Sequence, residues 1–454
     1  MTFVRIVVLS VFLAHLPTST PRAQETPWQA GVAKIAITPE KALWMSGYGG
    51  RTKPAQGKET ELWAKALFLE DSNGKKAILI TLDLVGIGRD ISVPLCKRIG
   101  EKYGLPREAI ILSCSHTHCG PVVGDNLRSM YFLDDDQERM IHDYSKALQD
   151  KIMQVVRHAV ENRALANLSW GIGKSGFAVN RRTNKEAEVP RLIEEGTLKG
   201  PVDHEVPVLA VHNVQGNLFA VVFGYACHAT VMDYLQWSGD YPGFAQIELE
   251  KTHADAVALF WAGCGADQNP LPRRELELAK RYGKQLADSV QTVLDGGMQR
   301  LGGSWGGAYR EIDLPYHQLP SREKLIMDSM STSKYEANRA KLLLKKLEAK
   351  GSLRGDYPYP IQAWRLGSEV TWVAMGGEVV VDYALRLKKE IGPKTWVMGY
   401  ANDVMAYIPS ARVLKEGGYE GGGAMLYYGL PSIWGANVEE LIVDNVLQIV
   451  EQTK

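Results

Sequence analysis

Two histidines separated by one residue, His116 and His118, form the first pattern in the sequence that could do chemistry. Side chains alternate along an extended segment, so both imidazoles lie on one side of the chain. This arrangement suits one metal ligand beside a second histidine that supports the ligand or acts in catalysis. His228 also follows an apolar segment, and two histidines with one carboxylate form a common catalytic zinc site with an open position for water. Glu378 is the candidate carboxylate, and a charge at a helix N-terminus is the alternative interpretation of that residue.

Other chemical motifs are missing from the sequence. It contains no HExxH, P-loop or CxxC pattern, which argues against a helix-based metalloprotease and a zinc ribbon. The five cysteines are an odd number, so at least one thiol is free, and we expect small buried side chains near a site. Six further histidines have no clustered partners, and we expect surface or hydrogen-bonded roles for them: His142, His158, His204, His212, His253 and His317.

Short apolar segments are the elements that must position these residues. Their continuous rather than alternating apolarity is typical of strands that are covered on both faces of a sheet. The predicted strands are 77–82, 110–112, 218–223, 257–260, 370–375 and 396–398. Amphipathic periodicity predicts helices near 141–160, 275–294, 321–349 and 438–450. The charged segment 321–349 is interpreted as a solvated structural helix, with a lid as the alternative.

Polar clusters follow five of the predicted strands. His116 and His118 follow the strand at 110–112, His228 follows 218–223, and Glu378 follows 370–375. Ligands in α/β sheets bind at the carboxyl ends of strands. We therefore predict an α/β fold with mixed sheets flanked by helices and a metal site at the carboxyl ends of the strands.

Composition narrows the class of protein. The chain has 454 residues, with 52 basic and 52 acidic side chains and a formal net charge of zero. This balance argues against a nucleic-acid partner, which normally needs a basic excess. A single large α/β domain and about three smaller domains are both compatible with this length.

The N-terminal segment has the pattern of a secretory signal. Arg5 precedes an apolar run from Ile6 to Leu16, which is too short to span a bilayer, and a polar stretch follows. A buried N-terminal strand is the alternative. We expect residues 1–23 to be a signal peptide and the mature, secreted or periplasmic chain to begin near Gln24.

A series of motifs along the chain carries a family resemblance. They are Gly31–Pro39, Met45–Tyr48, Thr81–Leu84, Leu112–Pro121, Asn180–Arg181, His228–Thr230, Ser238–Asp240, Gly243, Gly377–Glu378, Asn402, Tyr407 and Tyr419–Gly421. In this order they resemble the catalytic domain of neutral/alkaline, non-lysosomal ceramidases. The resemblance covers most of the mature chain.

The resemblance implies specific roles. It assigns Zn²⁺ to four ligands, which are His116, His228, Glu378 and Tyr407. It further implies catalytic roles for three residues, which are His118, Arg181 and Tyr419. The implied reaction is zinc-assisted amide hydrolysis, with zinc generating a hydroxide near neutral pH. Under this scheme His118 shuttles the proton to the leaving amine, Arg181 holds a polar substrate group, and Tyr419 lies near the scissile amide.

The sequence also departs from the family pattern. Ceramidases often read Gly-Asp-x-Ser-Pro where this chain reads Ala-Asp-Gln-Asn-Pro at 266–270, so Asn269 replaces a serine and a serine-nucleophile scheme does not apply. We expect residues 24–454 to form the ceramidase-like catalytic domain without the family's C-terminal β-sandwich domain.

The sequence is compatible with three functions. The first is cleavage of ceramide or another N-acyl lipid, with an apolar tunnel beside the metal and transient contact with a membrane surface. The second is a zinc hydrolase of a small polar or carbohydrate-derived substrate, with a shallow pocket lined by Arg181, Arg182, Asp240 and Asp403. The third is a non-catalytic binding protein, which the intact ligand set disfavours. The oligomeric state is left open.

Overall fold

The structure is a computed structural model that describes Thr2 and residues 28–454. The predicted signal peptide, apart from Thr2, lies outside the described residues. Within residues 28–454, no helix combines the length and the apolar character that crossing a bilayer requires.

The larger sheet is mixed and has nine strands among the described residues. Its strand order is β11-β9-β8-β6-β1-β3-β4-β5, and β13 pairs with β6. The strands are β1 (Trp28–Ala36), β3 (Trp63–Glu70), β4 (Lys76–Leu82), β5 (Ile110–Cys114), β6 (Ala164–Lys174), β8 (Glu205–Asn213), β9 (Leu218–Tyr225), β11 (Val257–Ala262) and β13 (Gln299–Arg300). β4 is parallel to β5, and β9 is parallel to β11, so their carboxyl ends lie at the same edges.

A second sheet has the order β14-β15-β16-β18. Its strands are β14 (Trp305–Pro315), β15 (Asp356–Leu366), β16 (Val370–Met375) and β18 (Thr395–Met398). β16 and β18 are parallel, and the other pairs are antiparallel. Three short pairs complete the strands: β2 (Gly57–Lys58) with β10 (Gln236–Trp237), β7 (Ala178–Asn180) with β12 (Gln268–Pro270), and β17 (Glu378–Val379) with β19 (Tyr407–Ile408).

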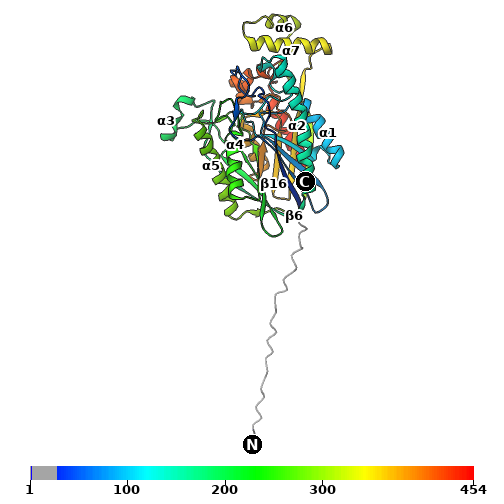
Figure 1. The fold of residues 1–454 in the computed structure, drawn as a ribbon, viewed down its shortest axis with the longest axis vertical. Coiled ribbons are helices and arrows are strands. Elements are labelled where there is room, and N and C mark those ends of the chain that lie inside the picture. Colours follow the sequence, from blue (N-terminus) through cyan, green and yellow to red (C-terminus); the bar gives the residue numbers. More distant parts are fainter. Residues whose placement is uncertain (1, 3–27) are drawn as a thin grey trace.

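Helices cover the outer faces of both sheets (Figure 1). α2 packs on β1 and β3, α4 and α5 pack on the strands at the other end of the larger sheet, and α8 and α11 pack on the smaller sheet. The helices are α1 (Arg89–Tyr103), α2 (Asp135–Glu161), α3 (Val189–Glu194), α4 (Asp240–Thr252), α5 (Leu276–Asp295), α6 (Arg322–Asp328), α7 (Lys334–Lys350), α8 (Val381–Ile391), α9 (Ala411–Glu416), α10 (Met425–Tyr428) and α11 (Val438–Glu451). Short helical turns occur at Arg107–Ala109, Arg128–Met130, Glu186–Glu188 and Tyr419–Gly423.

Three tryptophans join the inner faces of the two sheets. The ring of Trp261 on β11 lies 5.4 Å from that of Trp372 on β16, which lies 5.2 Å from Trp396 on β18. All three are at most 2% exposed. Aromatic rings bury a large apolar area in such tilted and edge-to-face contacts. Both sheets are therefore covered on two faces, which explains the continuous apolarity of their central strands.

The predicted α/β class and mixed sheets are confirmed. All six predicted strands and three of the four predicted helices are present; their ends change by at most two residues, except that α2 begins six residues earlier than predicted. The single helix predicted over 321–349 is wrong, because the chain forms α6 and α7 instead. Ser321 caps α6 by accepting a hydrogen bond from the Lys324 amide, and Ser333 caps α7 by accepting one from Glu336. A second N-cap serine thus starts a new helix within the segment.

Candidate metal centre and active site

Four residues from four different segments of the chain converge at the carboxyl ends of the strands. His116 follows β5, His228 follows β9, and Glu378 and Tyr407 begin β17 and β19. β17 and β19 pair in parallel with Glu378 directly opposite Tyr407. All four side chains are buried. The predicted metal-ligand residues are therefore brought together by the fold.

The ligand atoms of these residues lie close together around one point. Oε2 of Glu378 is 3.1 Å from Nε2 of His116 and 3.2 Å from Nε2 of His228. The Tyr407 hydroxyl is 3.3 Å from the same nitrogen of His228. Two donor atoms that each lie about 2.0 Å from a tetrahedral zinc are about 3.3 Å apart. The spacing therefore fits the first coordination shell of such an ion.

The tautomers of the two histidines also fit a cation. Nδ1 of His116 contacts the Val85 carbonyl at 2.7 Å, and Nδ1 of His228 contacts the Gly265 carbonyl at 2.7 Å. A carbonyl oxygen only accepts, so each Nδ1 carries the proton and each Nε2 presents a lone pair. Oε2 of Glu378 is buried without a hydrogen-bond partner. Nε2 of His116, Nε2 of His228 and Oε2 of Glu378 are thus three hydrogen-bond acceptors that face each other without a shared hydrogen, and a cation between them would relieve their repulsion. Two nitrogens and a carboxylate oxygen are ligand atoms that suit zinc.

Electrostatics keep the ligand atoms available. Burial, followed by the Arg181 charge, lowers the pKa of His228 to about 4, so its imidazole is neutral at neutral pH. Burial acts to raise the pKa of Glu378, but positive charge at the facing His116 and His228 outweighs it and holds this pKa well below its usual range, and a cation held between neutral imidazoles would supply that charge instead. Glu378 is therefore a carboxylate.

His118 lies beside this set as a further nitrogen. Its Nε2 is 3.2 Å from Nε2 of His116, and the ligand atoms of the three histidines lie within 4.8 Å of one another. A cluster of three histidines could also hold a metal, with His118 in place of Glu378. We place Glu378 in the ligand set, because its orphaned oxygen contacts both His116 and His228. His118 then borders the site and is available for proton transfer.

The backbone around the site is specialised. His116 and Tyr400 have φ angles of 60° and 53°, in the left-handed region that non-glycine residues rarely adopt. The Tyr400 ring lies 4.3 Å from the His116 ring and supports it. Gly47 has a φ of 96°, and a Cβ there would lie 2.4 Å from Nδ1 of His118. Only glycine leaves space for this imidazole, which explains the glycine in the Met45–Tyr48 motif.

Arg181 connects the metal-ligand group to a second charged pair. Its Nη2 donates to the Tyr407 hydroxyl at 3.1 Å, its Nε donates to Glu420 at 2.7 Å, and its Nη1 donates to Asn269 at 3.2 Å. Glu420 also accepts from Arg182 at 2.6 Å. Burial acts to lower the pKa of Arg181, but Tyr407 and Glu420 outweigh it, so the guanidinium stays charged. Asn269 serves here as an acceptor for Arg181.

Two residues of this arrangement were missed by the sequence analysis. The Tyr428 hydroxyl donates to Oε1 of Glu378, and Glu420 orients Arg181. Neither residue belongs to a motif with a chemical spacing. Glu420 carries a weak signal, because it directly follows Tyr419 within the Tyr419–Gly421 motif.

Tyr419 lies at the border of the site and of a surface cavity. Its ring is 5.2 Å from the Tyr407 ring, and the side chain is 43% exposed. The cavity has a volume of about 590 Å³ and is lined largely by charged residues and glycines, including Arg181, Arg182, Arg273, Glu186, Glu416 and Glu420. The predicted pocket with Arg181 and Arg182 thus exists. Its other two predicted members were wrong: Asp240 is fully buried against backbone amides, and Asp403 lines a different cavity.

The remaining histidines lie outside the ligand group, and the cysteines are buried core side chains. His142 is exposed, His204 contacts the Ala178 carbonyl, and His253 contacts Gln291. Within residues 28–454, none of the other histidines joins a cluster of three candidate ligands. All five cysteines are buried and free. Burial raises the pKa of their thiols, for Cys114 and Cys119 to about 12, as expected for small core side chains.

Comparison with known proteins places this chain in a family. The family model described as "Neutral/alkaline non-lysosomal ceramidase, N-terminal" matches residues 28–264. The chain belongs to the neutral/alkaline non-lysosomal ceramidase family. His116, His118, Arg181 and His228 lie within this match, whereas Glu378, Tyr407 and Tyr419 lie beyond it.

Individual relatives are distant. Neutral ceramidase B of Dictyostelium discoideum is 25% identical over 240 residues, which are 50% of this chain and 32% of that protein. Neutral ceramidase of Drosophila melanogaster is 24% identical over 264 residues, which are 56% of this chain and 35% of that protein. The chain thus matches about a third of the length of these curated relatives.

Solved structures support the fold over most of the chain. The crystal structure of neutral ceramidase from Pseudomonas aeruginosa superposes with a TM-score of 0.72 at 19% identity, over 94% of this chain and 74% of that one. A ceramidase complexed with C2 superposes equally well at 17% identity, over 94% of this chain and 75% of that one.

Proposed function

We propose that this chain is an exported, zinc-dependent amidohydrolase that cleaves an N-acyl amide, with ceramide as the first candidate substrate. One observation carries the proposal: Nε2 of His116, Nε2 of His228 and the orphaned Oε2 of Glu378 face one another in a buried site without a shared hydrogen. The family membership supports amide hydrolysis as the reaction.

In this proposal His116, His228, Glu378 and Tyr407 hold the metal. When bound, zinc lowers the pKa of water and polarises a carbonyl oxygen, which are the two needs of amide hydrolysis. Tyr428 fixes the carboxylate of Glu378 through its hydrogen bond. Arg181 fixes the Tyr407 hydroxyl and keeps it oriented toward His228.

The groups at the border of the site act on the substrate. His118 accepts a proton at Nε2 and transfers it to the leaving amine, since its imidazole lies beside the ligand group. The Tyr419 hydroxyl donates to the oxyanion that forms at the carbonyl, a contact typically worth about 3 kcal/mol in the transition state. Asn269 contributes no nucleophile, because an amide cannot replace a serine hydroxyl.

A polar substrate is the second candidate. The cavity beside Tyr419 is lined by three arginines and three glutamates, which suits a substrate with several hydrogen-bonding groups rather than a bare acyl chain. An N-acylated sugar or amino acid would satisfy both the amide chemistry and these side chains. In the lipid alternative the same residues face the hydroxyl groups of the sphingoid base.

Two further parts of the proposal concern the chain as a whole. We propose that residues 1–23 are a signal peptide that exports the protein, and that residues 24–454 form the ceramidase-like catalytic domain. The apolar run after Arg5 supports the first part, and the structural match over 94% of the chain supports the second.

A substrate panel tests the function. Purified mature protein, loaded with zinc, is incubated with short- and long-chain N-acylsphingosines and with N-acyl amino sugars, and the released fatty acid is measured. Release from the sphingosines that chelator abolishes and that Glu378→Gln lacks would support a ceramidase. Release from the amino sugars alone would favour the second candidate. Release from no amide by a folded, zinc-loaded protein would overturn the proposed function.

A further inference from the structure

The two helices α6 and α7 form a projecting unit at one end of the molecule (Figure 1). We name residues 321–354 the helical hairpin. It connects β14 to β15, which are adjacent antiparallel strands that a turn of a few residues could join. Leu325, Ala340 and Leu343 form a small core of their own, separate from the main core. The hairpin is therefore an addition to the sheet rather than a part of it.

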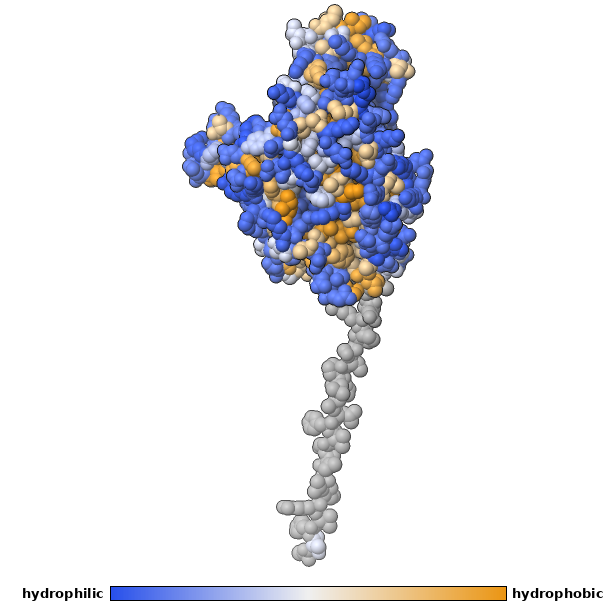
Figure 2. All heavy atoms as spheres, in the orientation of Figure 1, coloured by the Kyte–Doolittle hydropathy of each residue, from blue (hydrophilic) through white to orange (hydrophobic). Residues whose placement is uncertain are grey.

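The outer face of the hairpin exposes apolar side chains. Ile326, Met327 and Met330 are 45%, 65% and 74% exposed, although each would bury a large apolar area against a partner. Figure 2 shows apolar atoms among hydrophilic ones at this end of the molecule. Large apolar side chains grouped on a surface indicate a contact with a protein or a membrane.

The charge of the hairpin selects between these partners. Five exposed lysines of α7 form no salt bridge with any carboxylate of residues 28–454; they are Lys334, Lys341, Lys345, Lys346 and Lys350. Within residues 321–354, the exposed carboxylates are Glu323 and Glu348. The chain as a whole has no net charge, so this positive excess is local. Exposed apolar side chains flanked by lysines are typical of segments that bind anionic lipid surfaces.

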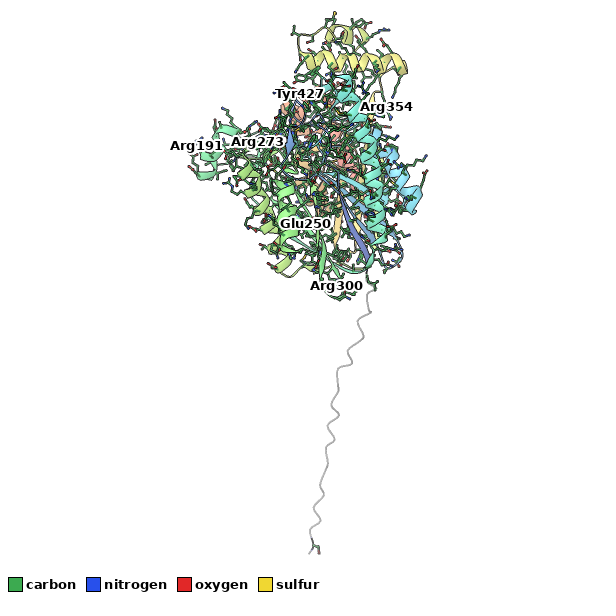
Figure 3. All side chains as sticks on the ribbon, viewed as in Figure 1. Arg191, Glu250, Arg273, Arg300, Arg354 and Tyr427 are labelled. Atoms are coloured by element: carbon green, nitrogen blue, oxygen red, sulfur yellow. The ribbon has the colours of Figure 1, made fainter. Side chains whose placement is uncertain are left out.

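A row of aromatic rings connects the hairpin to the candidate metal centre. The Tyr407 ring lies 5.2 Å from Tyr419, which lies 6.1 Å from Tyr427, which lies 5.1 Å from Tyr335 on α7. Tyr427 lies directly below the hairpin in Figure 3. The Tyr335 hydroxyl donates to the Gly49 carbonyl at 2.7 Å and so fixes α7 to the body. The basic, apolar end of the molecule is therefore continuous with the site.

We propose that the helical hairpin docks on anionic lipid bilayers, with Ile326, Met327 and Met330 entering the interface and the α7 lysines contacting the headgroups. This docking places the aromatic row against the bilayer surface, from which an N-acyl lipid reaches Tyr419. The arrival of an N-acyl lipid at Tyr419 rests on the proposed function, whereas the docking of the hairpin on the bilayer does not.

Vesicle co-sedimentation tests the docking directly. Wild-type protein is mixed with vesicles of phosphatidylcholine alone and of phosphatidylcholine with phosphatidylserine. We expect binding to the anionic vesicles that weakens as salt is added, and weaker binding to the neutral ones. The double variants Met327→Asp/Met330→Asp and Lys341→Gln/Lys345→Gln are each expected to bind anionic vesicles about tenfold more weakly or worse.

Helix α8 provides matched controls, because Leu385 and Lys389 are also exposed and α8 packs on the smaller sheet. Leu385→Asp and Lys389→Gln are expected to bind vesicles as wild type does. The proposal is overturned if the wild-type protein does not bind anionic vesicles, or if the hairpin variants and the α8 variants bind these vesicles equally well. It is also overturned if wild type is a dimer that Met330→Asp dissociates, since the face is then an interface between two copies.

Two activity assays distinguish a failure of the docking from a failure of the proposed function. Hydrolysis of a water-soluble short-chain amide is expected to be unchanged in the hairpin variants, whereas hydrolysis of vesicle-embedded ceramide falls with their binding. Vesicle binding by a protein that cleaves no amide would overturn the proposed function and leave the docking supported.

Discussion

The hydroxyl of Tyr428 donates a hydrogen bond to Oε1 of Glu378, which leaves Oε2 of that carboxylate facing His116 and His228. Both side chains are buried, so the contact is shielded from water. One oxygen of the carboxylate is thus used by the protein, and the other is available to a metal ion. Side chains that bind a metal are commonly held in place by a hydrogen bond to a second residue, and Tyr428 has this role for Glu378.

Removing this hydroxyl tests this role. Tyr428→Phe keeps the ring but frees Oε1, so the carboxylate can rotate out of position. We expect zinc affinity to fall by about 10- to 100-fold, with little change in unfolding temperature of the metal-free protein. Competition with a chromophoric chelator measures the affinity. Tyr427→Phe is the matched control, and an unchanged affinity in Tyr428→Phe would contradict the positioning role.

Arg181 is expected to need its guanidinium and not only its charge. It contacts Tyr407, Glu420 and Asn269 through three different nitrogens, which an ammonium group cannot do in one geometry. Arg181→Lys is therefore expected to lower kcat/KM for amide hydrolysis by about 100-fold, equivalent to about 3 kcal/mol. Arg182→Lys, at the other side of Glu420, is the control with an expected loss of less than tenfold. Equal effects of the two variants would refute this assignment.

Tyr419 is expected to act in the transition state. Its ring lies between Tyr407 and the cavity, so Tyr419→Phe removes a donor without opening a gap. We expect kcat to fall by about 100-fold while KM changes little, since the hydroxyl contacts an oxyanion that forms only during the reaction. Steady-state kinetics on the best amide of the panel provide the measurement. A rise in KM at constant kcat would instead indicate simple substrate binding.

Asp403 is expected to make stability depend on pH. Burial raises its pKa to about 7; the Tyr357 hydroxyl and Arg89 lower this pKa, and Asp90 and Glu311 raise it. The unfolded carboxyl has a pKa of about 3.9, so the folded state binds the proton more tightly and stability falls as pH rises from about 4 to about 7. Asp403→Asn removes this fall and is expected to be more stable than wild type by about 2–4 kcal/mol at pH 8, but not at pH 4. Urea unfolding at several pH values measures the difference. A difference that does not change with pH would contradict the prediction.

The strands that carry the site were predictable from the sequence for a physical reason. β5, β9, β11, β16 and β18 are covered on both faces, so their residues are uniformly apolar and a histidine or glutamate at their ends stands out. β1, β6 and β14 were not predicted, because residues such as Lys34, Gly171 and Glu311 interrupt their apolar pattern. In these strands one face is only partly covered, and pairing with neighbours determines the conformation.

The supporting residues of the site were less predictable than the ligands. Tyr428 is one of 19 tyrosines, and nothing in its local sequence distinguishes it from a core aromatic residue. Its role depends on α10 being folded back onto β17, which is a tertiary relationship. Asp240 and Asp403 were assigned to the polar pocket, but the sequence does not say toward which side of its segment a carboxylate points.

The rate of amide hydrolysis during a zinc titration of the metal-free protein tests the central claim most directly. The account predicts no activity in the absence of metal, a rate that rises in proportion to added zinc and saturates at one ion per chain, and no comparable rise in Glu378→Gln. Full activity of the metal-free protein, or zinc-dependent activity that survives in Glu378→Gln and in His228→Ala, would contradict it.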